Sequence, residues 1–195
     1  MKKRDFLALA STAAALPVGQ AWAAERPATQ SPALLTVGGP VGKGNRGPLD
    51  VELDQMLFKH GVKFSTAFAF DAPALMRLAR VTIRPTLEYD NKVHALSGPL
   101  LTTVLRAAGV RLAPGLRLGL RAVDGYNVVI SLADAEAYQM MVATHIDGQA
   151  MALGGLGPQW AVYDADRLPA FKDKPVKERF GLCPWGLYYI DVSQG

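Results

Sequence analysis

The stretch Leu96-Ser97-Gly98-Pro99-Leu100-Leu101, which continues to Val104-Leu105, carries the clearest secondary-structure signal in this chain of 195 residues. We expect a short strand over Lys92 to Leu96, followed by a helix over Leu100 to Ala108. Proline is favoured in the first turn of a helix, and Gly109 is placed to end this helix as a C-cap. The segment therefore predicts a strand that leads directly into a helix.

Upstream of this segment, the pattern alternates between strands and short helices. Asp71 is suited to cap a helix that carries Leu75, and Gly61 to end a helix that follows Asp50. Pro85 forces an edge position or an irregular end on the strand that contains it. The strands expected here cover residues 34–37, 62–70 and 80–87.

Downstream, most of the chain is predicted to form strands. Asp124-Gly125 and Asp147-Gly148 are turn signals, and the second is the strongest hairpin signal in the sequence. Ser131 is suited to cap a helical turn that runs through Ala137. The expected strands cover residues 116–123, 126–130, 138–146, 149–153, 159–163 and 186–192. Many strands with a few short helices indicate one α+β domain, which we place at residues 34–195.

The N-terminus has the pattern of a secretory signal peptide. A basic start precedes the apolar stretch Phe6 to Leu16, and Ala21-Trp22-Ala23 forms an Ala-x-Ala cleavage site. The apolar stretch is too short to span a bilayer as a stable anchor. We assign residues 1–23 as the signal peptide and 24–33 as a flexible leader, and we expect a periplasmic protein. The segment Lys3 to Leu7 resembles the twin-arginine signal with its first arginine replaced by lysine, so that route and general secretion both stay open.

Charge and cysteine count exclude several classes of protein. The full sequence has a net charge of +4, and cleavage removes three basic residues and one acidic residue, which leaves +2. So small an excess, without basic residues clustered among aromatic ones, argues against nucleic-acid binding. Cys183 is the sole cysteine, which excludes an internal disulfide and a multi-cysteine metal site. It is either buried or pairs between chains.

Four segments, taken in order, carry a family resemblance. They are the opening stretch from Leu96, the segment Ala122-Val123-Asp124-Gly125-Tyr126, Asp147-Gly148 with the later Gly157-Pro158, and the terminal strand from Trp185 to Val192. Together they resemble the oxidoreductase molybdopterin-binding domain, the fold of sulfite oxidase and its bacterial relatives. The resemblance covers residues 34–192 and implies an α+β fold of mixed sheets around a pterin pocket.

Catalytic members of that family hold molybdenum through a cysteine that follows a strand. The matching stretch here is Thr82-Ile83-Arg84-Pro85, with proline in place of the cysteine, and Cys183 lies far from it in the sequence. Soft metal ligation at that position requires a thiolate. The chain therefore resembles more closely the small periplasmic members that lack this cysteine. For some of these the resemblance implies a bound free pterin and a membrane receptor that makes or breaks cyclic di-GMP.

The resemblance implies a pterin site, for which the sequence offers four candidate residues. Asp124 has the carboxylate that accepts the amide and amino edge of a pterin, or else is an ordinary turn residue. Tyr126 and Trp160 are candidates for stacking on the ligand, or else core aromatics. Arg84 lies beside the missing cysteine and is predicted to face the cavity, unless it occupies an exposed strand face.

We therefore expect a periplasmic, non-redox pterin-binding protein that acts with a membrane receptor and does not itself span the membrane. Two alternatives stay open, namely a molybdopterin-dependent oxidoreductase with an atypical metal ligand and a ligand-free interaction module of the same fold. His60, His94 and His145 show no metal-ligand spacing, and no strand–turn–helix nucleophile elbow is recognisable. No catalytic residue and no metal ligand is assigned.

Overall fold

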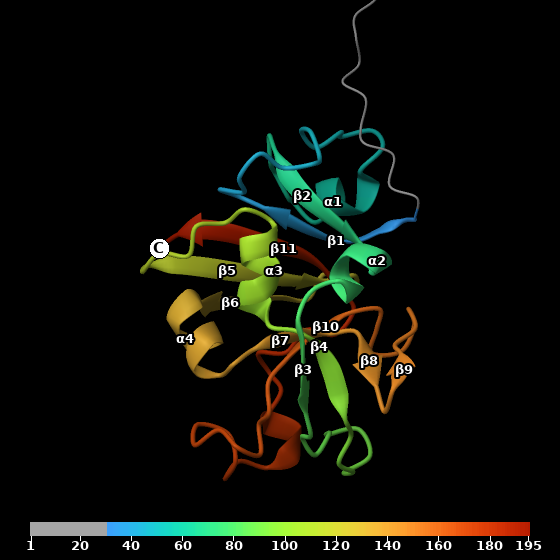
Figure 1. The fold of residues 1–195 in the computed structure, drawn as a ribbon, viewed down its shortest axis with the longest axis vertical. Coiled ribbons are helices and arrows are strands. Elements are labelled where there is room, and N and C mark those ends of the chain that lie inside the picture. Colours follow the sequence, from blue (N-terminus) through green and yellow to red (C-terminus); the bar gives the residue numbers. More distant parts are fainter. Residues whose placement is uncertain (1–30) are drawn as a thin grey trace, which may run out of the picture.

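The computed structural model describes residues 31–195, so the predicted signal peptide and most of the predicted leader lie outside the described residues. Within residues 31–195 the chain forms three sheets and several short helices (Figure 1). The first strand, β1 (Ala33–Gly38), begins one residue inside the predicted leader, because Ala33 already pairs with Asp71. In this part of the chain no helix has the length and apolarity that crossing a membrane requires.

A five-stranded sheet forms the centre of the molecule, with the strand order β2-β1-β11-β5-β6. Its strands besides β1 are β2 (Ala67–Asp71), β11 (Leu187–Gln194), β5 (Leu116–Ala122) and β6 (Asn127–Ser131). β1 and β11 are parallel, and the other neighbours in this sheet are antiparallel. The first and last described strands thus lie side by side, which ties both ends of the domain into one sheet.

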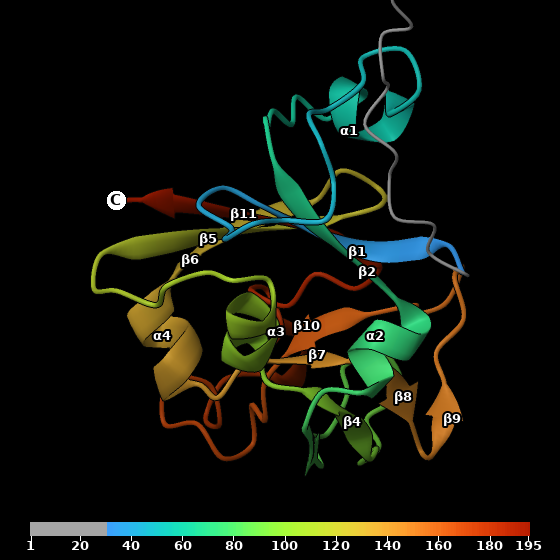
Figure 2. The ribbon, with the colours of Figure 1, turned by 45° about the horizontal axis from the view of Figure 1, so that its top comes forward.

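Two smaller sheets lie to one side of the five-stranded sheet (Figure 2). One has the order β3-β4-β8-β9, and the other pairs β10 with β7. Their bounds are β3 (Arg80–Ile83), β4 (Leu96–Pro99), β8 (His145–Ile146), β9 (Gln149–Ala150), β10 (Trp160–Val162) and β7 (Met141–Ala143).

The helices follow their predicted caps. Ser131 Oγ accepts a hydrogen bond from the Asp134 N–H at 3.0 Å, and Asp71 Oδ1 accepts one from the Ala74 N–H at 2.8 Å. Gly109 ends its helix with φ +81°, a conformation that favours glycine. The helices are α1 (Gln55–Lys59), α2 (Ala72–Met76), α3 (Leu101–Ala107), α4 (Leu132–Ala137) and the 3₁₀ helix η1 (Val176–Glu178).

The strand expected over Lys92 to Leu96 is displaced: β4 begins at Leu96, where the prediction had it end. The reason is a close approach at Gly98. A Cβ atom on Gly98 would lie 2.0 Å from the carbonyl oxygen of Val142, so only glycine lets this strand pack against β7. α3 follows directly, as predicted.

Four other predicted strands are too long. The strands expected over 80–87 and 149–153 end early, at Ile83 and at Ala150. Of the expected strand 62–70, only Ala67 to Phe70 is extended, because Val62 turns back to hydrogen-bond Leu57 at the end of α1. The expected strand 138–146 begins only at Met141, because Gln139 has φ +50° in the turn after α4. It is also divided into β7 and β8, which belong to different sheets.

The main core lies between the five-stranded sheet and the layer of smaller sheets and helices below it (Figure 2). α1 lies on the opposite side of the five-stranded sheet, where it covers a second, smaller cluster. That cluster contains Leu57, Val62, Tyr188 and Tyr189. The five-stranded sheet is therefore packed on both of its faces.

Candidate functional site

A cavity of about 330 Å³ lies where three connecting segments meet. The β3–β4 loop contributes Glu88 and Tyr89, and the β5–β6 connection contributes Asp124 and Tyr126. The segment before β11 supplies Lys177, Phe180, Gly181, Cys183, Pro184 and Trp185. This volume is at the lower end of the range for small-molecule sites. Two of the four predicted site residues, Asp124 and Tyr126, are thus brought together at one cavity.

The β5–β6 turn fixes the orientation of both residues. Asp124 Oδ1 accepts a hydrogen bond from the Tyr126 N–H at 2.9 Å, and Gly125, with φ +92°, permits the tight turn between them. The Tyr126 hydroxyl donates to the carbonyl oxygen of Gly181 at 2.7 Å, across to the segment before β11. Asp124 Oδ2 forms no hydrogen bond within residues 31–195 and is available to a ligand.

Tyr89 and Trp185 add two further aromatic side chains to the wall of the cavity. Tyr89 is 55% exposed and Trp185 36%, so both rings retain accessible surface. Desolvation of its hydroxyl raises the pKa of Tyr89 to about 12, and the adjacent Glu88 carboxylate acts in the same direction. A hydrogen bond with Trp185 opposes this shift in the pKa. Tyr89 therefore stays protonated and neutral at physiological pH.

The β3–β4 loop and the segment before β11 are fastened to each other by Asp166. Its Oδ2 accepts a hydrogen bond from the Thr86 N–H at 2.7 Å, and its Oδ1 pairs with Arg179 Nη1 at 2.6 Å. Thr86 lies two residues before Glu88, and Arg179 lies within the segment that forms the facing wall. One carboxylate thus sets the distance between two walls of the cavity.

His94 holds the other end of the same loop. His94 Nδ1 lies 2.6 Å from Asp147 Oδ2 in the β8–β9 turn, and His94 Nε2 lies 3.0 Å from Asp90 Oδ2. These two hydrogen bonds, the one to Asp147 first, raise the pKa of His94, and the histidine in turn lowers the pKa of both carboxyl groups. The two carboxylates therefore favour the charged form of His94 and clamp the loop that carries Glu88 and Tyr89.

Trp160 lies behind the cavity and does not line it. Its side chain is fully buried, and its indole N–H donates to the carbonyl oxygen of Cys183 at 2.8 Å. Its ring packs against Tyr89 and Phe180, with centroid distances of 6.4 and 5.9 Å. This corrects the prediction that Trp160 stacks on a ligand, since neither face of the ring is accessible. Trp160 is instead a core aromatic residue, which was the alternative interpretation.

Arg84 also lies outside the cavity. It is exposed just after β3, and its charge acts on the Asp147 carboxyl group of the β8–β9 turn. The expectation that Arg84 faces the cavity is therefore wrong. The alternative, an arginine on an exposed face, is confirmed. The chain turns inward after it, at the buried Pro85, so the loop meets the cavity only from Glu88 onward.

Cys183 contributes to the cavity wall, where its side chain is buried. Burial raises the pKa of its thiol to about 12, and hydrogen bonds with Tyr163 offset only part of that effect on the pKa. The uncoordinated thiol therefore keeps its proton at neutral pH and would have to lose it on binding a metal. Pro85, which the family resemblance places where catalytic members have their metal-binding cysteine, has no sulfur.

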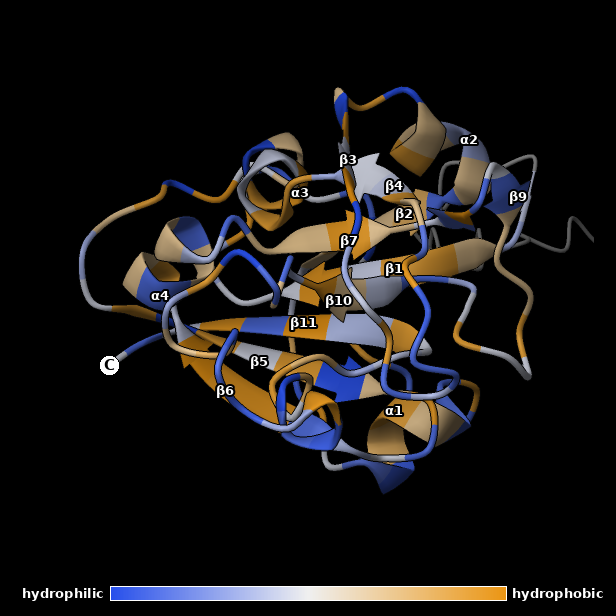
Figure 3. Cartoon of the chain, turned by 90° about the horizontal axis from the view of Figure 1, so that it is seen from below, coloured by the Kyte–Doolittle hydropathy of each residue, from blue (hydrophilic) through white to orange (hydrophobic). Residues whose placement is uncertain are grey.

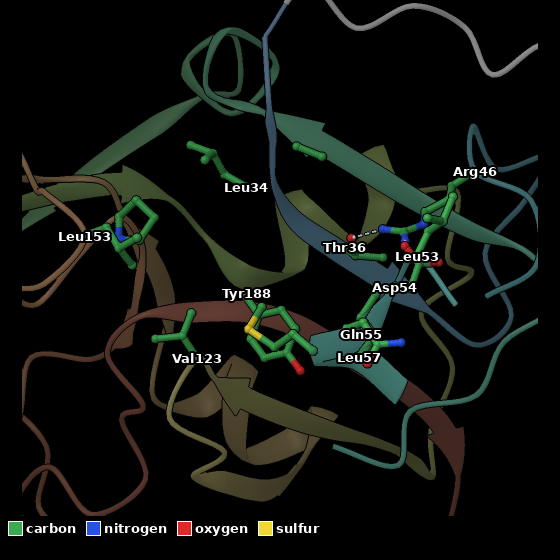
Figure 4. A pocket seen from close by; sticks show the side chains of 13 residues that line it. Leu34, Thr36, Arg46, Leu53, Asp54, Gln55, Leu57, Val123, Leu153 and Tyr188 are labelled. Carbon is green, nitrogen blue, oxygen red and sulfur yellow. Dashed lines mark hydrogen bonds and ion pairs between the residues drawn. The ribbon is translucent and has the colours of Figure 1, made fainter. Parts of the chain in front are cut away.

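A second cavity, of about 320 Å³, lies on the other side of the β5–β6 connection (Figure 4). Leu34, Leu53, Val123 and Leu153 are among the mainly apolar side chains that line it. Its charged residues, Arg46 and Asp54, form an ion pair with each other, and Arg46 Nη1 also donates to Thr36 Oγ1 at 3.3 Å. None of the predicted site residues lines this second cavity.

Comparison with known proteins supports the fold. No family model and no curated protein matches the sequence. Among solved structures, the chain is similar to the sulfane dehydrogenase SoxCD from Paracoccus pantotrophus, with a TM-score of 0.53 and 13% sequence identity. The match covers 83% of this chain and 38% of that chain, so the protein spans well under half of its structural relative. At this identity the likeness concerns the fold alone, and it confirms the predicted α+β, sulfite-oxidase-like fold.

The sequence did not single out Glu88, Tyr89 or Lys177. Glu88 and Tyr89 lie in a connecting loop and Lys177 in the three-residue helix η1, where no hydrophobic periodicity marks which side chains face inward. Trp185 belongs to a segment that carried the family resemblance, although it was not selected as a site residue. For Tyr89, the available signal was its place four residues after Pro85, where the family resemblance implies the position of a metal-binding cysteine.

Proposed function

We propose that the protein is a periplasmic, non-redox binding protein for a free pterin. The observation that carries this proposal is the cavity in which the free Asp124 carboxylate oxygen lies among three accessible aromatic side chains, Tyr89, Tyr126 and Trp185. Carboxylate and aromatic groups in one cavity suit a flat ligand that has a hydrogen-bond donor edge.

The chemistry of a pterin matches these groups. Its amide N–H and amino group form a donor edge, which a carboxylate accepts as a bidentate partner. Asp124 supplies that carboxylate from a rigid turn, and Glu88 brings a second carboxylate from the facing loop. Tyr126 is held in place by Gly181, so stacking on its ring costs little side-chain entropy. Lys177 is suited to a carbonyl or anionic group on the opposite side of the ligand.

The proline at position 85 supports a non-redox role. Pro85 replaces the thiolate ligand that the family resemblance implies, and the Cys183 thiol is buried and protonated. In this proposal the cavity binds the organic part of a molybdopterin, and no cysteine stands at the position that the resemblance assigns to the metal ligand.

The signal-peptide pattern and the family resemblance support a regulatory role outside the cytoplasm. In this role, the pterin-loaded protein acts on the periplasmic domain of a membrane enzyme that makes or breaks cyclic di-GMP. Deletion of the gene in its host is expected to change the cellular level of cyclic di-GMP. An Asp124→Asn allele is expected to reproduce that change, and an unchanged level in the deletion strain would remove the regulatory part of the proposal.

Fluorescence titration with biopterin tests the binding site. Asp124→Asn is expected to weaken biopterin binding by about 10- to 100-fold, because a charged hydrogen-bond acceptor is lost. Asp173→Asn is the matched control, since Asp173 is an exposed aspartate that does not line the cavity. Absence of binding by the wild-type protein would leave the ligand-free interaction module as the better description.

Metal analysis separates the proposal from the oxidoreductase alternative. Protein exported by its native host is expected to release a pterin on extraction and to contain no stoichiometric molybdenum. One molybdenum atom per chain would overturn the non-redox assignment and show an atypical metal ligand.

A further inference from the structure

The strand β3 forms an edge of its sheet, because the order β3-β4-β8-β9 gives it a neighbour on one side only. It lies at the end of the molecule away from α1 (Figure 1, Figure 3). Arg80 and Thr82 in this strand, and Arg84 directly after it, are exposed. An exposed edge strand offers unpaired backbone N–H and C=O groups, which makes it a template for another extended chain.

The hydrogen bonds of the sheet show which backbone groups point outward. The Ser97 carbonyl accepts from the Thr144 N–H at 2.9 Å, so the backbone groups of Ser97 face β8. Because these directions alternate along an antiparallel strand, the neighbouring Gly98 faces β3, where it pairs with Val81. The backbone groups of Val81 therefore point into the sheet. Along this strand and its continuation, the residues that alternate with it and face outward are Arg80, Thr82, Arg84 and Thr86.

Thr86 shows the outward direction directly. Its N–H donates to Asp166 Oδ2 at 2.7 Å, whereas the carbonyl of the preceding Pro85 faces the sheet and accepts from the His94 N–H at 3.2 Å. A carboxylate from another part of the chain thus occupies one outward donor of this edge. The next outward N–H groups, those of Arg84 and Thr82, form no hydrogen bond within residues 31–195.

The edge is also basic. Residues 72–87 contain no aspartate or glutamate and three arginines, which are Arg77, Arg80 and Arg84. Arg80 Nη2 donates to Ser97 Oγ at 2.7 Å, which holds the guanidinium across the exposed face of the sheet. Neither Arg80 nor Arg84 forms an ion pair within residues 31–195. The Asp147 carboxylate, on which the charge of Arg84 acts, is already bound to His94 at 2.6 Å. The positive charge of the edge is therefore available to a partner.

We propose that the β3 edge binds an extended segment of a partner protein that has acidic residues at alternate positions. The segment adds a strand beside β3, and its backbone pairs with the outward groups of Arg80, Thr82 and Arg84. Residues directly opposite each other in a sheet place their side chains on the same face. Alternate carboxylates of the segment therefore lie beside the two arginines.

A second copy of the chain does not suit this edge. Two β3 strands paired antiparallel around Thr82 would place Arg80 opposite the partner's Arg84, and like charges directly opposite destabilise a sheet. The proposal is also independent of the pterin site, because none of these three residues lines the cavity that contains Asp124.

Titration with a capped peptide of about six residues, the usual strand length, in which glutamate alternates with valine, tests the proposal. Followed by the amide NMR signals of the purified protein, it is expected to give a Kd between about 10 μM and 1 mM, with the largest shifts at Thr82 and Arg84. Arg80→Glu and Arg84→Glu are each expected to raise the Kd at least about 5-fold, because like charges then lie opposite each other. Arg117→Glu is the matched control, since Arg117 is an exposed arginine on β5, which has a neighbour on both sides.

Backbone methylation of the peptide separates strand addition from simple charge attraction. N-methylation of the glutamates removes the donors that face β3 and is expected to abolish binding, whereas N-methylation of the valines, whose N–H groups face away, leaves binding intact. The double variant Arg80→Glu with Arg84→Glu is expected to bind a lysine–valine peptide instead.

Three results would overturn the proposal. The first is no binding of the glutamate–valine peptide at about 1 mM. The second is equal affinity for the two methylated peptides, or equal affinity of the wild type for the glutamate and lysine peptides. The third is self-association of the wild type in sedimentation equilibrium that the peptide abolishes, which would identify a second copy as the occupant of the edge.

Discussion

The two cavities beside the β5–β6 connection differ in chemistry although neighbouring residues line them. Ala122, Asp124 and Tyr126 face the first cavity, and Val123 between them faces the second. In the first, Asp124 keeps one carboxylate oxygen unbonded within residues 31–195. In the second, the Asp54 carboxylate is already paired with Arg46. The first is therefore suited to polar recognition and the second to apolar contact.

The difference shows that the presence of a carboxylate in a cavity does not by itself indicate a ligand site. What matters is whether the protein already satisfies it. Asp54 is held by Arg46 and by the Asp50 N–H, which donates to its Oδ2 at 2.9 Å, so it stabilises the start of α1. Asp124 makes one local bond that orients it and leaves the other oxygen open.

The largest effect is expected at the support behind the first cavity. Trp160→Ala removes a fully buried ring and its hydrogen bond to Cys183, and is expected to lower the free energy of unfolding by about 3–5 kcal/mol. Urea denaturation measures this loss. Trp185→Ala is the comparison, because the partly exposed Trp185 is expected to affect biopterin binding more than stability. A small stability loss for Trp160→Ala would show that Trp160 is not a core residue.

The same chemical change in the two cavities is expected to give opposite results. Asp54→Asn leaves the Arg46 guanidinium unpaired in a mostly buried site, and is expected to cost about 3 kcal/mol of stability without changing biopterin affinity. Asp124→Asn is expected to reduce biopterin affinity with little change in stability, because Asp124 is exposed. Urea denaturation and titration of both variants check this. If Asp54→Asn also weakened biopterin binding, the separation of the two cavities would fail.

These assignments show which features the sequence alone could predict. Strands such as β5 and β6, and caps such as Asp71 and Ser131, depend on local patterns and were predicted with nearly correct bounds. β4 was displaced because its position depends on a backbone contact between Gly98 and Val142, which are distant in sequence. The pattern of residues near Gly98 in the sequence contains no information about a contact with Val142.

The candidate site was predicted in part for the same reason. Asp124 and Tyr126 share one turn, so one motif located both of them. Trp160 and Arg84 have the right chemistry, but the packing of β10 and the end of β3 directs them elsewhere. Tyr89 joins the cavity through a loop whose path depends on distant partners, among them Asp166. Burial and tertiary hydrogen bonds, rather than residue type, decide which side chains are available.

A pH-dependent effect is expected at the clamp on the β3–β4 loop. Because the pKa of His94 is raised in the folded state, its stabilisation is complete below about pH 6.5 and is lost as the pH rises through the folded-state pKa. The pKa values of Asp90 and Asp147 are lowered, so their stabilisation is present above about pH 4 and lost as the pH falls through their folded-state pKa values. The clamp is therefore strongest between about pH 4 and 6.5.

Thermal unfolding of His94→Gln across the range from about pH 4 to 9 tests this clamp. The difference in Tm from the wild type is expected to be largest within the window above and to shrink at higher pH. Lys63→Gln, which alters an exposed cation beside α1, is the control and is expected to show no such pH dependence. A Tm difference that is constant across pH would contradict the charge-based clamp.

The smallest effect is expected from Tyr126→Phe, which keeps the ring and removes only the hydrogen bond to Gly181. We expect a loss of stability of no more than about 1 kcal/mol and a decrease in biopterin affinity of about 2- to 5-fold, since the ring stays but is less firmly held. Val123→Ala, three residues earlier and facing the other cavity, is expected to leave that affinity unchanged. Titration of both variants then measures how much binding depends on the orientation of the ring. Equal losses of biopterin affinity from Tyr126→Phe and Val123→Ala would contradict this expectation. They would mean that the cavity a residue of the β5–β6 connection faces does not determine its role in binding.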